Sequence, residues 1–423
     1  MKNPLLQMRA VLLSKIESVY NTDAVPTQDD AMLVSEPDFT VDPNMLERNF
    51  SRNSLSTLAH RVGRKLAGMT FGLELRGSGN VATAPKLGRH LRASGYAETQ
   101  ITAGASQVGA VRRHPEGVAG PNVAWGGAAM GVVSPPEPIM YTIEVMTGGI
   151  SGTAKVSITP DTNSVVQGYD TVRTNLSITT GTALQLKGTG NGAAITPTFA
   201  GTLVVGQKWV VFVFPVGWLY TPVSSNFESV TNYLYRDGIL HKQPGGRATF
   251  TIEGTAGEYP TMSFTYTGQY KKPIDAAMPA TPVYEATLPP VVENANLAIN
   301  EYMATVNRFS FDQGNRISPR SDVSASDGYN GVNLVGRDPK GGIDPEMALV
   351  ADEDFWQRLA DADQMYFRMR FGNEVGNRSW VIAPGVQYTS MTYSNRDSYL
   401  VLDAGLRFPQ FAAGDDEVMF FFG

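Results

Sequence analysis

The sequence has 423 residues, a formal net charge of −6 and a hydrophobic content of 42%. That length is typical of about two to three domains with a sizeable core, and no apolar run approaches the roughly 20 residues of a membrane-spanning helix. The absence of cysteine excludes disulfides, thiolate metal sites and cysteine catalysis. Abundant Phe, Tyr, Val, Thr and Gly, with few helical patterns, predict a mainly β protein.

Charge is distributed unevenly along the chain. Residues 1–135 carry 14 basic and 11 acidic side chains, residues 136–224 carry four of each, and residues 225–423 carry 16 basic and 25 acidic ones. A basic stretch often contacts nucleic acid or is simply solvated. Because the last third of the same chain is acidic, identical copies could also dock basic edge to acidic edge.

Residues 1–46 are predicted to form an extended arm with one strand near Met8–Tyr20. Arg9 and Lys15 interrupt the apolar run there, so we do not expect a secretory signal peptide. A strand is also predicted between Met69 and Leu75, because apolar residues alternate with polar or small ones as on a half-buried strand.

A short amphipathic helix is predicted after the breaker Gly77-Ser78-Gly79. Leu87 and Leu91 stand four residues apart, Pro85 suits a first helical turn, and Gly95 suits the position just after a helix. Glycines and prolines then predict a long loop over residues 96–136. Since so long a loop is unusual in a compact domain, it is expected to have a functional role or to join two domains.

Residues 137–224 have a different pattern, with short Thr/Val-rich strands and frequent turn signals, which is typical of a small sandwich. Beyond them, Phe250 and Ile252 face a second alternating run, Met262 to Thr267, across a glycine turn. This arrangement predicts a hairpin with one apolar and one polar face, and a proline-rich connector follows over residues 273–290.

The last third repeats the order strand, glycine breaker, short helix and hairpin. Val332 and Leu334 predict the strand and Gly341-Gly342 the breaker. Asp352-Glu353-Asp354 is predicted to cap a helix that carries Phe355 and Leu359 on one face, and a hairpin begins at Met365. The same order around residues 47–95 and 250–267 indicates an internal duplication.

No catalytic constellation is found. The histidines are scattered without metal-ligand spacing: His60, His90, His114 and His241. The acidic groups Asp352-Glu353-Asp354 and Asp415-Asp416-Glu417 are explained by helix capping and solubility, because neighbouring carboxylates on one turn do not face each other across a substrate. We therefore expect no enzyme activity, no cofactor and no metal.

The segment ERNFSRNSLSTLAHRVGRKLAGMTFGLELRGSG begins at Glu47 and APKLGRHLRASGY begins at Ala84. With these and the later segments YLYRDGILHKQPGGRATFTIEG, EYPTMSFTYTGQYKKP and AGDDEVMFFFG, the chain resembles the tail tube proteins of long, flexible-tailed bacteriophages. The resemblance covers most of the chain outside residues 137–224. It implies a structural virion protein whose rings stack into a hollow tube with a closed β-barrel as inner wall.

The resemblance implies a tail-tube β-sandwich with short flanking helices. With the duplication, we predict one tube-fold unit at residues 1–136 and 225–280 and a second at residues 281–423. Residues 137–224 would be an inserted, Ig-like β domain that decorates the outside of the tube. Many family rings are hexamers of a single fold, so a duplicated chain would form a trimer with pseudo-sixfold symmetry; a hexamer stays open.

The predicted contacts between subunits or rings are basic: Arg48, Arg52, Arg61, Arg64, Lys65, Arg89 and Arg92. The predicted lumen-facing residues are polar and lie on the two hairpins: Ser263, Thr265, Thr267, Gln387 and Thr389. A polar, acidic wall would repel DNA, whereas a wall that neutralised phosphates would bind it.

The expected partners are further copies of the chain, a tape measure protein, and tail terminator and distal tail proteins. DNA would pass through the lumen without specific binding, no membrane is expected, and the virion would be assembled in the bacterial cytoplasm. Two alternatives remain open. One is another virion β protein, such as a baseplate or receptor-binding component; the other is a carbohydrate-binding protein that uses Trp209 and Trp218.

Overall fold

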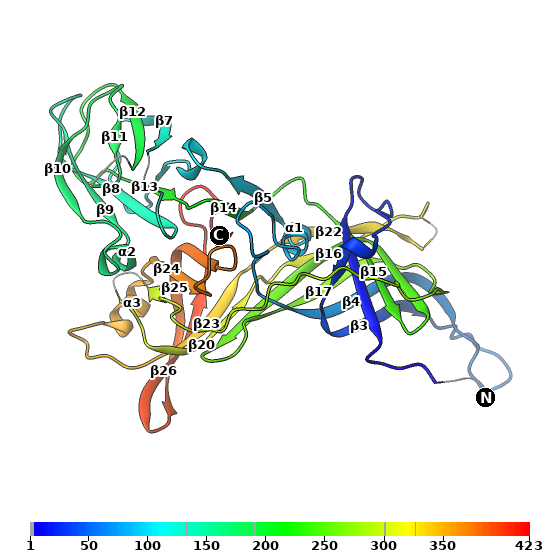
Figure 1. Ribbon diagram of the computed structural model, residues 1–423. Helices are drawn as coiled ribbons and strands as arrows, with labels where there is room; N and C mark the ends of the chain where they lie inside the picture. The colour runs from blue at the N-terminus through cyan, green and yellow to red at the C-terminus, as the bar shows by residue number, and fades with distance from the viewer. Residues whose placement is uncertain (1–3, 132–133, 189–191, 300–301, 326) are drawn as a thin grey trace.

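The computed structural model describes residues 4–131, 134–188, 192–299, 302–325 and 327–423. A large body of antiparallel strands makes up most of the chain, and a smaller β module lies against one end of it (Figure 1). The short helices are α1 (Gly88–Ala93), α2 (Thr162–Val166) and α3 (Phe355–Asp361), with 3-10 turns η1 (Gln28–Asp30) and η2 (Ala105–Gln107). The mainly β prediction is confirmed.

Eight antiparallel strands form one open sheet, the long sheet, in the order β3–β4–β17–β16–β20–β23–β26–β25. They are β3 (Ser35–Leu46), β4 (Arg61–Glu74), β17 (Thr261–Gln269), β16 (Ile239–Thr255), β20 (Val306–Asp312), β23 (Lys340–Pro345), β26 (Tyr399–Arg407) and β25 (Ser379–Arg396). Met262, Phe264 and Tyr266 are buried while Ser263 and Thr265 are exposed, which confirms the predicted two-faced hairpin.

Two smaller sheets pack on the apolar face of the long sheet. The first outer sheet contains β2 (Ala31–Met32), β1 (Ala10–Ile16), β15 (Val230–Arg236), the start of β16, and β18 (Ile274–Asp275). The second contains β19 (Ala298–Ile299), β24 (Met365–Phe371), the start of β25, β27 (Met419–Phe422), β14 (Gly217–Pro222) and β5 (Tyr96–Ile101). One continuous apolar core joins all three sheets, so the body is a β-sandwich.

The same order of pairings occurs twice in the body. In the first repeat β15, β16 and β17 follow one another as hairpins, and β17 pairs with β4, which pairs with β3. In the second repeat β24, β25 and β26 do the same, and β26 pairs with β23, which pairs with β20. α1 precedes the hairpins of the first repeat and α3 those of the second.

A row of paired residues aligns the two repeats position by position. β16 leaves the first outer sheet at Pro244-Gly245, and β25 leaves the second at Pro384-Gly385. Three residues after each proline, the row across the long sheet is Arg247–Thr267–Gly68–Thr40 in the first repeat and Gln387–Arg407–Lys340–Asp312 in the second. Residues in the same place of the two rows are equivalent.

Both predicted helices are confirmed. Leu87 and Leu91 of the α1 region are buried, and Gly95 follows the helix with φ 88°, a conformation that suits glycine. At α3 the Asp354 side chain accepts a hydrogen bond from the Gln357 backbone N–H at 2.9 Å, as an N-cap residue does. Phe355 of α3 is fully buried.

The smaller module has two sheets. The strands of the first sheet lie in the order β10 (Arg173–Ser177), β9 (Lys155–Pro160), β8 (Ile139–Thr147), β13 (Lys208–Val213) and β6 (Arg112–Arg113). The strands of the second lie in the order β11 (Leu184–Gln185), β12 (Ala193–Phe199) and β7 (Val123–Met130). These pairings begin before residue 137, and β14, within the predicted insertion, pairs with β5 and β27 of the body instead. The module has its own apolar core, from Val108 to Val213.

Two local predictions are wrong. Residues 96–136 are not one loop, because β5, β6 and β7 lie in them; their glycine-rich backbone is hydrogen-bonded to strands far along the chain. Gly341-Gly342 does not end a strand but lies inside β23, between β20 and β26. Gly341 fits there because a Cβ would stand 2.4 Å from the Ser310 carbonyl oxygen.

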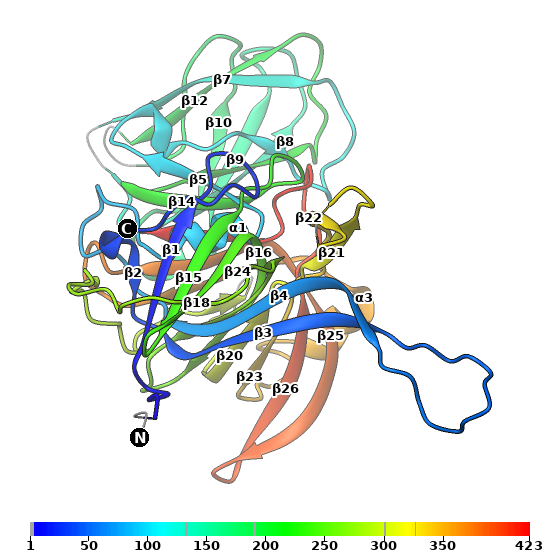
Figure 2. The same ribbon diagram turned by 90° about the vertical axis from the view of Figure 1, so that its right-hand side faces the viewer.

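The outer faces of the two repeats are covered differently. The proline-rich connector places Met278 and Tyr284 against Leu13 and Tyr233 of the first outer sheet. On the second outer sheet, Tyr366, Trp380 and Phe421 pack against the module residues Met140, Val210 and Phe214. Figures 1 and 2 show the module lying across that end of the body.

Candidate assembly surfaces

The long sheet ends in two strands that have a partner on one side only. Among the described residues, β3 pairs with β4 alone, and the part of β25 from Gln387 to Arg396 pairs with β26 alone. Such edges expose unpaired backbone groups and invite pairing with another chain. Asp38, Pro43 and Asp42 lie on β3, and charges and prolines on an edge limit uncontrolled pairing.

At the junction between the repeats, the corresponding strand edges are paired with each other. There β16 pairs with β20, so that Ile252 lies opposite Phe311 and both are buried, with 0% and 1% of their surfaces exposed. Ile252 stands five residues after Arg247 of the row. In the second repeat one residue is added for the β-bulge between Tyr388 and Ser390, so the equivalent of Ile252 is Tyr393, six residues after Gln387. Tyr393 is 58% exposed on the free edge of β25.

The partner position on the other free edge is Phe39, the equivalent of Phe311. Phe39 is half-buried and lies against His241, with ring centroids 4.5 Å apart. The free edges thus leave apolar side chains partly exposed at positions that are buried at the internal junction. Exposed apolar groups of this kind are typical of surfaces that another chain covers. The two free edges carry Tyr393 and Phe39 at the positions equivalent to the buried Ile252 and Phe311.

A hairpin arm leaves the long sheet in each repeat. The first arm, residues 41–67, connects Thr40 to Gly68, and the second arm, residues 313–339, connects Asp312 to Lys340, so the two arms have the same length. β21 (Arg316–Ser321) and β22 (Tyr329–Gly336) form the second arm. Figure 2 shows the tip of the first arm reaching away from the body, whereas β21 and β22 lie beside β4.

The second arm is held on the first repeat by polar contacts. The Arg247 guanidinium donates to the Val332 carbonyl at 2.8 Å, Gln269 Nε2 donates to the Tyr329 carbonyl at 3.3 Å, and the Lys65 backbone N–H donates to the Asp327 carbonyl at 3.3 Å. Arg64 also donates to Ser321 Oγ at 2.7 Å and lies over the Tyr329 ring.

The first arm carries exposed apolar and basic side chains. Large apolar residues are exposed along it: Val41, Met45, Leu46, Phe50, Leu55 and Val62. Leu55 and Phe50 are exposed by 106% and 68%, which is unusual for a group of such residues in one segment. The tip also carries Arg48, Arg52 and Arg61, all of them exposed.

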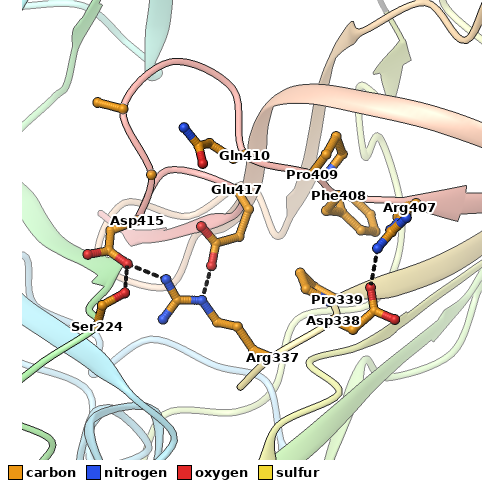
Figure 3. Close-up of a pocket in the computed structure, with 12 residues that line it drawn as sticks. Ser224, Arg337, Asp338, Pro339, Arg407, Phe408, Pro409, Gln410, Asp415 and Glu417 are labelled. Carbon is orange, nitrogen blue, oxygen red and sulfur yellow. Dashed lines mark hydrogen bonds and ion pairs between the residues drawn. The ribbon is translucent and has the colours of Figure 1, made fainter. Parts of the chain in front are cut away.

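A pocket of about 540 Å³ lies on the second repeat (Figure 3). Arg337 and Asp338, between β22 and β23, form one wall, and Pro409 and Gln410 after β26 form the other. Arg337 is ion-paired with Asp415 and Glu417, and Arg407 with Asp338 at 3.0 Å.

The loop at the rim of this pocket is held together by hydrogen bonds to Asp416. Asp416 accepts backbone hydrogen bonds from Phe411, Ala412 and Ala413 at 2.9 to 3.0 Å, and its carboxylate lies 2.9 Å from the Arg112 guanidinium of the module. Burial alone would raise the pKa of Asp416, but these N–H donors and Arg112 outweigh it and lower that pKa below its usual value. These contacts tie the loop beside the pocket to the module.

A family model described as phage tail tube protein matches residues 8–393. The chain belongs to the phage tail tube protein family. It is a structural protein of the virion tail, and the family implies that its copies assemble into a tube. A comparison with curated proteins gives no match. The two free edges, the arms and the pocket are thus surfaces of a protein that associates with itself.

The predicted basic contacts of this tail tube protein fall into two groups. Arg48, Arg52 and Arg61 are exposed on the first arm, and Arg64 and Lys65 lie at its base, against the second arm and Tyr270. Arg89 and Arg92 instead form ion pairs within the chain, with Asp30 at 3.1 Å and with Glu228 at 2.5 Å. Arg64 and Lys65 thus contact other parts of the same chain, whereas Arg48, Arg52 and Arg61 are exposed.

The predicted lumen residues of the tube protein lie on the polar face of the long sheet. Ser263, Thr265 and Thr389 are exposed, Thr267 is half-buried, and Gln387 is half-buried with its amide against the Ala362 carbonyl. Sequence reasoning did not identify the charges on this face, because the order of the strands was unknown. The exposed acidic ones are Asp38, Asp42, Glu253, Asp312 and Asp403, and the basic ones Arg308, Lys340 and Arg407.

Buried charges fix the module on the body of the tube protein. Arg368 of β24 is 1% exposed and lies 3.3 Å from Glu137 and 3.7 Å from Asp161. Burial opposes the charge of Arg368, but attraction by Asp161 and Glu137 raises its pKa above the usual value. Arg370 also pairs with Glu137. These buried ion pairs lie at the contact between the module and the body.

Trp209 does not offer the tube protein an open carbohydrate platform, because it is 6% exposed and packs edge to face on Trp125. None of the helices in the described part of the chain has the length and apolarity to span a bilayer. Within the described ranges, no three His, Asp or Glu side chains are placed to hold a metal ion.

Proposed function

We propose that three copies of this tail tube protein form one ring with pseudo-sixfold symmetry, and that the rings stack into the tube of a long, flexible-tailed phage. The observation that carries the proposal is the junction between β16 and β20. It joins the repeats inside the chain, and the free edges of β25 and β3 carry its equivalents.

The internal junction also sets the expected register between copies. Thr251 pairs with Asp312 inside the chain, and their equivalents are Thr392 of one copy and Thr40 of the next. Tyr393 would then lie opposite Phe39 and be buried, as Ile252 and Phe311 are. Eight strands from each of three chains would close a barrel of 24 strands, in which no sheet edge remains exposed.

In this ring the polar face of the long sheet lines the lumen. Five exposed carboxylates against three basic side chains make the face acidic, and most of its other side chains are Ser or Thr. An acidic wall repels phosphates, so DNA would slide through without binding. Ser263, Thr265, Thr267, Gln387 and Thr389 remain our proposed lumen residues.

The two repeats are proposed to be two tube-fold units, and the module to be a decoration on the outside of the tube. The position of the module supports this proposal, because the module packs on the second outer sheet, on the side of the sandwich opposite the polar face. The ends of the tube would meet tape measure, terminator and distal tail proteins. We propose a non-enzymatic role, with assembly in the host cytoplasm.

The ring is tested by cysteine pairs, since the chain has no cysteine of its own. Thr40→Cys with Thr392→Cys should give disulfide-linked species of three chains on oxidation, because directly opposite residues of an antiparallel pair have suitable spacing. The matched internal pair, Thr251→Cys with Asp312→Cys, should link within one chain. Thr40→Cys with Tyr393→Cys should not link, since a shift of one residue points the side chains to opposite faces.

Native mass measurement of purified rings supplies the stoichiometry independently. Three chains per ring are expected, and electron microscopy should show tubes. Rings of six chains would remove the pseudo-sixfold trimer while keeping a tube. A protein that stays monomeric and instead binds or cleaves glycans would overturn the proposed assembly.

A further inference from the structure

We propose that the first arm of each copy docks on the second repeat of the neighbouring copy and fills the pocket lined by Arg337 and Pro409. This inference rests on the proposed ring, and it adds a second contact to the pairing of β25 with β3. The occupant of the pocket is thus residues 41–67 of another copy of this chain.

The second arm shows where an arm binds on a repeat. Its backbone carbonyls are held by Lys65, Gln269 and Arg247 of the first repeat. Arg247 of β16 belongs to the row Arg247–Thr267–Gly68–Thr40. Gln269 of β17 stands two residues after Thr267 of this row, and Lys65 of β4 stands three residues before Gly68. The place on the first repeat that receives an arm is therefore defined by its position relative to that row.

The row alignment transfers this place to the second repeat. The equivalents of Lys65, Gln269 and Arg247 are Arg337, Pro409 and Gln387. Arg337 and Pro409 are two of the residues that line the pocket of about 540 Å³. The position that holds an arm in the first repeat is thus an open pocket in the second (Figure 3).

Strand order decides which copy supplies the arm. The first arm grows from β3 and β4 at one edge of the long sheet, whereas β26 and β25, beside the pocket, lie at the other edge. None of the residues that line the pocket comes from the first arm of the same chain. Pairing of β3 with β25 of the next copy brings the arm and the pocket together, as pairing of β20 with β16 does for the second arm.

The chemistry of the two surfaces agrees with this contact. The first arm exposes Phe50 and Leu55 together with Arg48, Arg52 and Arg61. Pro409 forms an apolar part of the pocket wall, and the charged lining residues are three acidic ones, Asp338, Asp415 and Glu417, and two basic ones, Arg337 and Arg407, that pair with them. Apolar side chains of the arm would leave water as it binds, and the one negative charge that the pocket carries in excess would favour the basic arm.

The contact is tested by thiol cross-linking within rings. Thr57 is the equivalent of Tyr329, and Gln410 follows Pro409 at the pocket, so Thr57→Cys with Gln410→Cys should be joined by a short bis-maleimide into three-chain species. Mixed rings of the two single variants should give two-chain products only. The matched pair Tyr329→Cys with Tyr270→Cys should react within one chain, and Thr57→Cys with Asp397→Cys, at the far tip of the β25–β26 hairpin, should not react.

A shortened arm separates a contact within rings from a contact between rings. Replacement of residues 48–59 by Gly-Asn-Gly should raise the concentration at which rings dissociate by at least tenfold, with the circular dichroism of the chain unchanged. Rings of unchanged strength that fail to stack would show that the arm acts between rings, which overturns the inference.

The two proposals can fail separately. If Thr40→Cys with Thr392→Cys links three chains while Thr57→Cys with Gln410→Cys does not react, the ring stands and the arm contact is wrong. If the unaltered protein forms neither rings nor tubes, the proposed function itself fails.

Discussion

The second arm lies on the first repeat and is held there by Arg247, Gln269 and Lys65, whereas the first arm, of the same length, reaches into solvent with Phe50 and Leu55 exposed. The same contrast holds for the sheet edges, because Ile252 is buried at the internal junction while its equivalent Tyr393 is 58% exposed. The docked second arm and the β16–β20 junction show which contacts the free first arm and the free edges do not make. Variants at equivalent positions of the two repeats can therefore be compared directly.

The largest effect is expected from a charge at the open edge. Tyr393→Lys should abolish rings, since a lysine would have to be buried at the position that Ile252 occupies inside the chain. The monomer should stay folded because Tyr393 is 58% exposed. Native mass and circular dichroism check both points. Tyr259→Lys, with a similar exposure of 57% in the turn after β16, should keep three chains per ring.

The next effect concerns the outer faces of the repeats. Arg368→Leu should lower the free energy of unfolding by about 3 to 5 kcal/mol, because it leaves the buried Glu137 and Asp161 without this partner. Tyr233 holds the equivalent position on β15, where its hydroxyl donates to Asp23 at 2.5 Å. Tyr233→Leu should cost only about 1.5 kcal/mol. Equal losses in urea unfolding would contradict the assigned role of the buried charges.

A pH effect should distinguish the helices. His90 of α1 is fully buried and hydrogen-bonded to the Tyr266 hydroxyl at 2.6 Å, and burial lowers its pKa well below 6.5. Below about pH 6.5 this histidine binds a proton in the unfolded chain but not in the folded protein. The free energy of unfolding should therefore decrease as the pH is lowered, by at most about 1.4 kcal/mol per pH unit.

His90→Gln should flatten the fall in stability between pH 6.5 and 5, measured by urea unfolding, whereas His60→Gln on the exposed arm should not. His114 and His241, whose pKa values burial also lowers, remain in both variants and contribute equally. α3 contains no histidine and should add no such slope. An unchanged slope in His90→Gln would contradict the assignment.

The smallest effect is expected at the helix starts. Asp354→Ala should cost about 1 kcal/mol, because it removes the hydrogen bond to the Gln357 N–H that caps α3. α1 has no side-chain cap at Leu87. Asp352→Ala, just outside α3, should change the free energy of unfolding by less than about 0.5 kcal/mol. A loss at Asp352 equal to that at Asp354 would rule out capping as the cause.

The alternation at Met69–Leu75 and Met262–Thr267 correctly predicted strands, and Asp354 and Gly95 correctly predicted helix ends. The strands within residues 96–136 were missed because Gly and Ala in β7 have weak strand preference, and only pairing with β12 supplies their hydrogen bonds. The roles of Arg89 and Arg92 could not be foreseen, since Asp30 and Glu228, their partners, lie far away in sequence.

By itself, the sequence determined a mainly β chain without cysteine chemistry, the polar and apolar faces of its hairpins, its short helices and its resemblance to tail tube proteins. These features follow from local periodicity, capping and composition, which act over a few residues. Tertiary structure alone decided that β16 meets β20, that one arm is docked and the other free, and that the carboxylates share one face. Strand partners are chosen by packing across the whole chain, which no local pattern records.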